Sequence, residues 1–148
     1  MATAPAKLTF EDIQASLEAM KAQTRAPRNP VWVADIASKL GIQVWPELIE
    51  QACDTRAEVY LNGGWRGGKT YTGDFSAFLY LFDLVMLYPG EHLVWLVGPD
   101  YVQARPDFFN LTEWAGKMGF GVQATDRMDG SLRATVTMSR FPGTVIIE

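Results

Sequence analysis

The sequence predicts an α/β fold in which a parallel sheet is flanked by helices and preceded by a small helical leader. Three segments predict it: a glycine-rich run at residues 63–70, a β-prone run before it at 57–62, and a long apolar stretch after it at 71–88. A strand, a glycine loop and a helix in this order begin a β-α-β unit. We expect the leader to span residues 1–54 and the α/β domain to span 55–148, incomplete at its C-terminus.

The glycine-rich run reads G-G-W-R-G-G-K-T and matches the phosphate-binding pattern G-x-x-x-x-G-K-[ST] in full. Glycines let the backbone curl so that its N–H groups point at phosphate oxygens, and the positive end of the following helix faces the same anion. Lys69 adds a charge for the outer phosphates, and the Thr70 hydroxyl is expected to bind Mg²⁺. The sequence therefore predicts an ATP site of the P-loop NTPase type, formed by Gly63, Gly64, Trp65, Arg66, Gly67, Gly68, Lys69 and Thr70.

Lys69 and Arg66 are the candidate catalytic residues within this loop. Arg66 either stabilises charge on a transferring phosphate or is a solvated loop residue, and the sequence does not separate these two roles. The alternative to a phosphate loop is a glycine-rich hairpin turn. A hairpin needs a second alternating strand, whereas residues 71–88 have the length of a helix.

Composition limits the functions open to this chain. It has 148 residues, of which 48% are hydrophobic and 20% charged, as in globular domains. The net charge of −4 argues against a nucleic-acid backbone bound by this segment alone. The single Cys53 excludes an internal disulfide and a multi-cysteine zinc site, and we expect it to be a small buried apolar residue. We expect no secretory signal and no membrane span.

The leader is predicted to be helical. Phe10, Ile13, Leu17 and Met20 recur at helical spacing and predict an amphipathic helix over residues 9–24. Prolines break the chain at 25–30, a second helix is expected at 31–40 before Gly41, and a third from Pro46 to about Asp54. A different interpretation takes residues 33–52 as a helix-turn-helix that binds DNA. The second helix of that motif contains Glu47 and Glu50 and no Lys or Arg, which disfavours this function.

The rest of the chain is expected to continue the sheet. The apolar run at 92–98 is typical of a strand buried on both faces of a parallel sheet, and 100–117 is predicted to be a helix. Residues 132–139 and 144–148 are predicted to form a hairpin around Pro142 and Gly143. The chain ends within an apolar strand, so we expect it to be a fragment of a longer protein.

A P-loop hydrolase also needs an acid on a second strand to hold the Mg²⁺ shell. Asp83 lies in the predicted helix, where a solvated or capping role is favoured, and Glu148 is placed in the hairpin. We therefore expect this chain to bind ATP and Mg²⁺ weakly and to hydrolyse ATP negligibly.

Other polar residues have both functional and structural interpretations. Gln51 either contacts adenine or is an exposed helix residue, which we favour. Gln103 and Arg105 either couple the nucleotide site to DNA or form a polar helix start, and the lone His92 is expected to be structural. The aromatic residues of the long helix are expected to belong to the core; they are Phe75, Phe78, Tyr80, Phe82 and Tyr88.

The phosphate loop, together with the stretch G-P-D-Y-V-Q-A-R at residues 98–105, resembles the large terminase subunit of tailed bacteriophages. That family has an apolar strand ending in a small-Pro-x-Tyr-x-Gln-Ala-Arg stretch soon after its phosphate loop, followed by a hairpin like that expected at 132–148. The similarity covers about residues 47–148. It departs from the family at Trp65, where many members have arginine, and in the leader.

This resemblance implies the ATP-binding part of a motor that packages viral DNA into a procapsid. The implied partners are double-stranded DNA, bound mostly outside this segment, a portal protein, the small terminase subunit and other copies in a ring, in the cytoplasm of the bacterial host. A fragment of another P-loop ATPase, a helicase or a kinase is the alternative.

Overall fold

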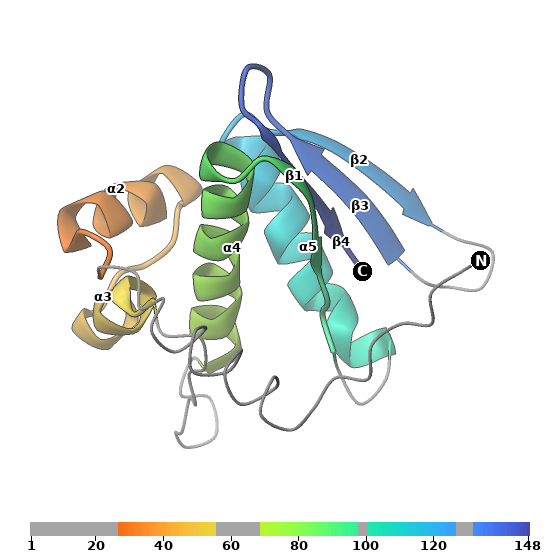
Figure 1. The fold of residues 1–148 in the computed structure, drawn as a ribbon. Helices are drawn as coiled ribbons and strands as arrows, with labels where there is room; N and C mark the ends of the chain where they lie inside the picture. The colour runs from red at the N-terminus through yellow and green to blue at the C-terminus, as the bar shows by residue number, and fades with distance from the viewer. Residues whose placement is uncertain (1–26, 56–68, 98–100, 127–131) are drawn as a thin grey trace, which may run out of the picture.

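The computed structural model describes residues 27–55, 69–97, 101–126 and 132–148. The predicted phosphate-loop strand at 57–62, residues 63–68 of the loop and the predicted helix at 9–24 lie outside these ranges. The described part is a mixed α/β structure (Figure 1). Its elements are α2 (Pro30–Leu40), α3 (Pro46–Cys53), α4 (Lys69–Leu87), β1 (Gly90–Val94), α5 (Tyr101–Lys117), β2 (Gly121–Asp126), β3 (Leu132–Thr137) and β4 (Gly143–Ile147).

The sheet described by the structure is mixed and has the strand order β1-β4-β3-β2. β1 pairs in parallel with β4, whereas β4 with β3 and β3 with β2 are antiparallel. The predicted hairpin at 132–148 is therefore confirmed. The expectation of a parallel sheet is wrong for these four strands, because the successive strands β2, β3 and β4 pair antiparallel and the parallel pairing is limited to β1 with β4.

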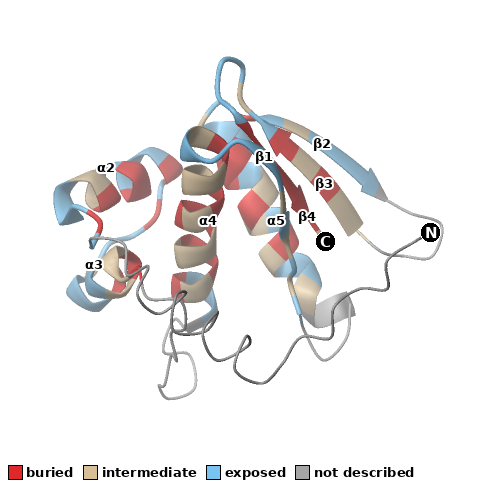
Figure 2. Cartoon of the chain, in the orientation of Figure 1, coloured by how far each residue is buried: buried red, intermediate tan, exposed pale blue. Residues whose placement is uncertain are grey.

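Helices α4 and α5 lie side by side on one face of the sheet, and α2 and α3 lie beyond α4 (Figure 1). Ala134, Val136, Val145 and Ile147 point toward this layer and belong to the same core cluster as residues of all four helices. The buried residues, red in Figure 2, lie along the inner sides of the helices and in the central strands. The core thus fixes the long helix α4 between the sheet and the leader.

One prediction for β1 is wrong, and the reason is the exposure of the sheet face that points away from α4 and α5. We expected the run at 92–98 to be buried on both faces, but exposure alternates along it, and Leu93, Trp95 and Val97 are 53%, 69% and 87% exposed. These three residues project away from the α4 and α5 layer. A continuous apolar run therefore does not distinguish a strand covered on both faces from one covered on a single face.

The leader helices α2 and α3 form where their caps and breakers predict. The Asn29 side chain accepts a hydrogen bond from the N–H of Val31, and Gly41 ends α2 in the left-handed conformation at φ 74°. Pro46 opens α3 at a position where no helical N–H bond is lost. Leu40, Leu48 and Ala52 are buried in the common core, so the leader packs on the α/β part.

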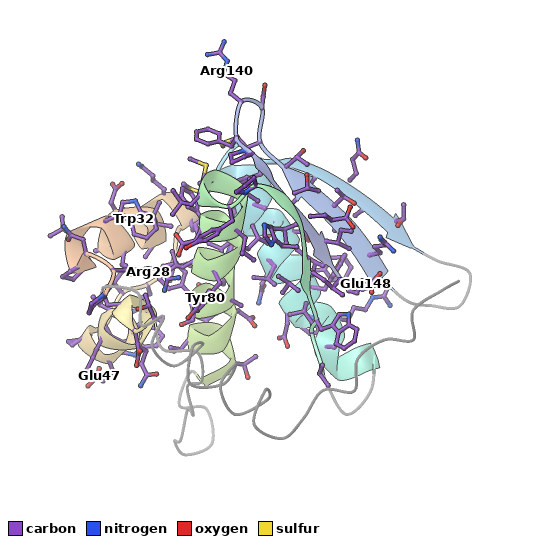
Figure 3. The ribbon with its side chains drawn as sticks, viewed as in Figure 1. Arg28, Trp32, Glu47, Tyr80, Arg140 and Glu148 are labelled. Carbon is purple, nitrogen blue, oxygen red and sulfur yellow. The ribbon has the colours of Figure 1, made fainter. Side chains whose placement is uncertain are left out.

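One ion pair ties the leader to α4. The Arg28 guanidinium lies 2.8 Å from the Asp83 carboxylate and 4.7 Å from the centre of the Tyr80 ring, and it also donates to the carbonyl of Ala52 (Figure 3). The two ionised side chains are only 6% and 16% exposed. Asp83 was expected to be solvated or to cap a helix. That expectation is wrong, because the chain segment before α2 places Arg28 against α4.

Candidate functional site

The candidate site is the amino end of α4, where the glycine-rich run meets a helix. α4 begins at Lys69, so the predicted helix after the loop is confirmed, and Thr70 lies exposed in its first turn. The first turn of a helix has backbone N–H groups without intrahelical partners and carries a partial positive charge. This end of α4 therefore favours an anion. The predicted nucleotide-binding residues Gly63, Gly64, Trp65, Arg66, Gly67 and Gly68 lie outside the described residues.

A buried carboxyl group lies one turn below Thr70. Asp74 is 6% exposed and accepts a 2.7 Å hydrogen bond from the Asn110 amide of α5. It is also hydrogen-bonded to Asp107, one turn before Asn110. The pKa of Asp74 is raised to about 6, chiefly by burial; the Asn110 hydrogen bond acts against this, and the neighbouring Asp107 carboxyl adds to the increase.

A shared proton accounts for this arrangement. Burial also raises the pKa of Asp107, whereas its hydrogen bond with Asp74 lowers it. Below about pH 6, Asp74 is thus the carboxyl that carries the proton and donates a hydrogen bond to Asp107. Sequence reasoning missed this pair, although Thr70 and Asp74 are spaced i, i+4 and therefore share one face of a helix. The pair joins the second turns of α4 and α5, next to the candidate site.

An aromatic cluster holds the same two helices together. Trp114 of α5 is 5% exposed and makes edge-to-face contacts with Tyr71, Phe75 and Phe78 of α4, at ring-centre distances of 5.7, 6.3 and 6.0 Å. Such contacts contribute about 0.5–1.5 kcal/mol each beyond burial. The expectation that the aromatic residues of this helix are core is confirmed for Phe75 and Phe78. Tyr88, at 37% exposed, lies at the surface.

The two acids considered for the Mg²⁺ shell are engaged in ion pairs. Asp83 is held by Arg28, and Glu148 lies 2.9 Å from Arg133 of the adjacent strand β3. The backbone of Glu148 continues the pairing of β4 with β1, through hydrogen bonds with Val94 and Leu96. Both acids therefore have structural roles in the described part of the chain.

Gln51 is not the exposed helix residue that we expected. Its side-chain oxygen is fully buried and has no hydrogen-bond partner among the residues that the structure describes. The periodicity of the short helix α3 does not reveal this burial. A contact with adenine stays a hypothesis.

The remaining predicted positions lie near α5 and β1. The stretch with Gln103 opens α5, and Arg105 is exposed and lies over the Phe109 ring at 5.7 Å. His92 lies 3.2 Å from the Tyr88 carbonyl and contacts the Tyr88 ring edge-on, which agrees with a structural role. Cys53 was expected to be buried; it is half-buried beside the core, and burial raises the pKa of its thiol.

The described part of the leader, residues 27–54, offers little unpaired positive charge for DNA. The exposed residues of α3 include Glu47 and Glu50, and Lys39 of α2 is paired with Asp35 at 2.7 Å. Within residues 27–55, 69–97, 101–126 and 132–148, no three acidic, histidine or cysteine side chains gather as a metal site. No helix in these ranges combines the length and apolarity of a membrane span.

Comparisons of the chain with protein-family models, with curated proteins and with solved structures gave no match.

Proposed function

We propose that residues 63–70 bind the polyphosphate of ATP with Mg²⁺, and that the chain is the ATP-binding part of a viral DNA-packaging motor of the large terminase type. The observation that carries the proposal is that α4 begins at Lys69, directly after the glycine-rich run. A phosphate loop requires a helix that starts at this point, because the helix amino end and the loop N–H groups act on the same anion.

Each residue of the motif has a separate role in this proposal. The glycine backbone binds the phosphates, Lys69 neutralises the outer phosphate charge, and Thr70 completes the Mg²⁺ coordination. Arg66 stabilises charge that develops during phosphoryl transfer. Thr70 is exposed in the first turn and so is accessible to a ligand. Asp74 and Trp114 hold this end of α4 against α5, so that the helix does not rearrange when the anion binds.

The motor assignment rests on the order of elements after the loop. β1 leads within a few residues into α5, which opens with the Tyr-x-Gln-Ala-Arg stretch, and the β3–β4 hairpin then adds β4 parallel to β1. This order supports the resemblance to the terminase large subunit. Because Asp83 and Glu148 are committed to Arg28 and Arg133, we expect ATP binding without appreciable hydrolysis by this chain alone.

Nucleotide competition tests the site. A fluorescent ATP analogue should bind to the wild-type chain in the presence of Mg²⁺, and Trp65 should transfer energy to it. ATP, ADP and pyrophosphate should compete, whereas AMP should not, because the loop grips the outer phosphates. Lys69→Ala should weaken binding at least tenfold, and Lys39→Ala, which removes an exposed lysine of the leader, should leave it unchanged. Equal competition by AMP would contradict a phosphate loop.

A further inference from the structure

An open groove, here called the leader groove, lies between α3 and the chain segment that precedes α2. It has a volume of ≈ 700 Å³ and is lined mainly by apolar side chains, among them Pro27, Val44, Trp45, Ile49 and Cys53. Val44 is 42% exposed, and Trp45, Ile49 and Cys53 are half-buried. An open groove with an apolar lining can receive the apolar side of another chain segment.

The chain itself supplies a segment that fits this groove. Residues 9–24 carry Phe10, Ile13, Leu17 and Met20 on one side of a predicted helix, and the opposite side carries Ala15 and Ala22. The stripe from Phe10 to Met20 would extend about 15 Å along the helix axis, similar to the ~12 Å length of α3 beside the groove. Packing an apolar helix face into an apolar groove is a common mode of recognition.

Chain connectivity favours this segment over other occupants. Pro27 lies at the groove rim, so only residues 25–26 separate it from the end of the predicted helix, a reach of about 10 Å when extended. A tether this short gives an effective concentration on the order of millimolar, which a free partner seldom reaches. Lys21, at the border of the stripe, also complements Glu50, the exposed acid of the groove.

We propose that residues 9–24 form an amphipathic helix that docks its apolar side into the leader groove of the same chain. The helix then covers Trp45, Ile49 and Cys53 and extends the leader by one packed element. Arg28 also lines the groove and bonds Asp83 of α4, so the docked helix lies next to the connection between the leader and α4. This proposal does not depend on ATP binding.

Cys53 provides the test, because it lines the groove and is the only cysteine in the sequence. A second cysteine is placed in the full chain at a stripe position, by Ile13→Cys, Leu17→Cys or Met20→Cys. The matched controls on the opposite side are Ala15→Cys and Ala22→Cys. After mild oxidation at low protein concentration, an intramolecular disulfide should form at least tenfold faster for one or more stripe positions than for both controls. Non-reducing gels and mass spectrometry distinguish disulfides within one chain from those between two.

Alkylation of Cys53 gives an independent measurement without a new cysteine. Leu17→Asp should raise the maleimide reaction rate at least fivefold, and Ala15→Asp should not, with circular dichroism checking that both variants are folded. Equal disulfide rates for stripe and control positions, or an unchanged alkylation rate in Leu17→Asp, would overturn the proposal. Disulfides formed only between two chains would also overturn it, and would assign the groove to a second copy.

Discussion

Asp74→Asn should stabilise the protein at pH 7 and have little effect at pH 4. The native Asp74 carboxyl has its pKa raised from 3.8 to about 6, chiefly by burial. Between about pH 4 and pH 6 the native state therefore holds more protons than the unfolded state, so stability falls as the pH rises through this range. The pKa of Asp107 is raised as well, and its effect has the same sign.

The magnitude follows from the size of the shift. About two pKa units correspond to at most ~3 kcal/mol at 1.36 kcal/mol per unit. Asp74 lies one turn from the exposed Thr70, so solvent screening reduces the effect, and we expect about 1–2 kcal/mol. An asparagine keeps the acceptor for Asn110 and offers an amide donor to Asp107, which replaces the shared proton without a buried charge.

Urea unfolding followed by circular dichroism at several pH values between 4 and 7 measures this difference. The free energy of unfolding of Asp74→Asn should exceed that of the wild type by an amount that grows with pH. Asp35→Asn is the control, because Asp35 forms an exposed ion pair with Lys39 and should show a difference below about 0.5 kcal/mol at every pH. A variant less stable than the wild type at pH 7 would refute the reasoning, since it would mean that the ionised Asp74 is stabilised in the native state.

Three further variants test the packing around α4. Asp83→Ala leaves the Arg28 guanidinium buried without its carboxylate and should lower the free energy of unfolding by about 2–4 kcal/mol in urea titration, whereas Arg28→Met combined with Asp83→Ala should recover part of this loss. Gly143→Ala places a Cβ against the Leu84 carbonyl and 2.7 Å from the Tyr88 carbonyl. It should therefore lower the free energy of unfolding by about 3 kcal/mol, which is measured as a lower melting temperature. Its control, Gly116→Ala, adds a Cβ that meets nothing within 4 Å inside α5 and should be neutral or stabilise by about 0.5–1 kcal/mol.

The helices were predictable because local signals specify them. Pro30, Pro46 and the breaker Gly41 act within a few residues, and the apolar stretch at 71–88 has helical length and no internal proline. Helices α2, α3 and α4 form close to the predicted bounds. The β3–β4 hairpin was predicted from Pro142 and Gly143, and the pairing is confirmed. The turn itself lies just before them, where the Phe141 N–H bonds the Met138 carbonyl and Arg140 has φ 74°, and Gly143 is the first residue of β4.

Features that depend on distant parts of the chain could not be predicted. β2 has a weakly apolar sequence, and its pairing with β3 gives it the strand conformation, so the sequence alone does not indicate it. The Arg28–Asp83 and Asp74–Asp107 contacts join residues 55 and 33 positions apart, and no spacing rule connects them. The nucleotide site stays a prediction, since Lys69 and Thr70 begin α4 as expected and residues 63–68 lie outside the described part.

Calorimetric titration of the chain with ATP and Mg²⁺, compared between the wild type and Lys69→Ala, tests the central proposal most directly. We expect weak saturable binding to the wild type, weakened by chelation of Mg²⁺ and reduced at least tenfold in Lys69→Ala with the fold intact by circular dichroism. Equal affinity of the two proteins for ATP, or no binding to the wild type at millimolar ATP, would contradict a phosphate loop at residues 63–70.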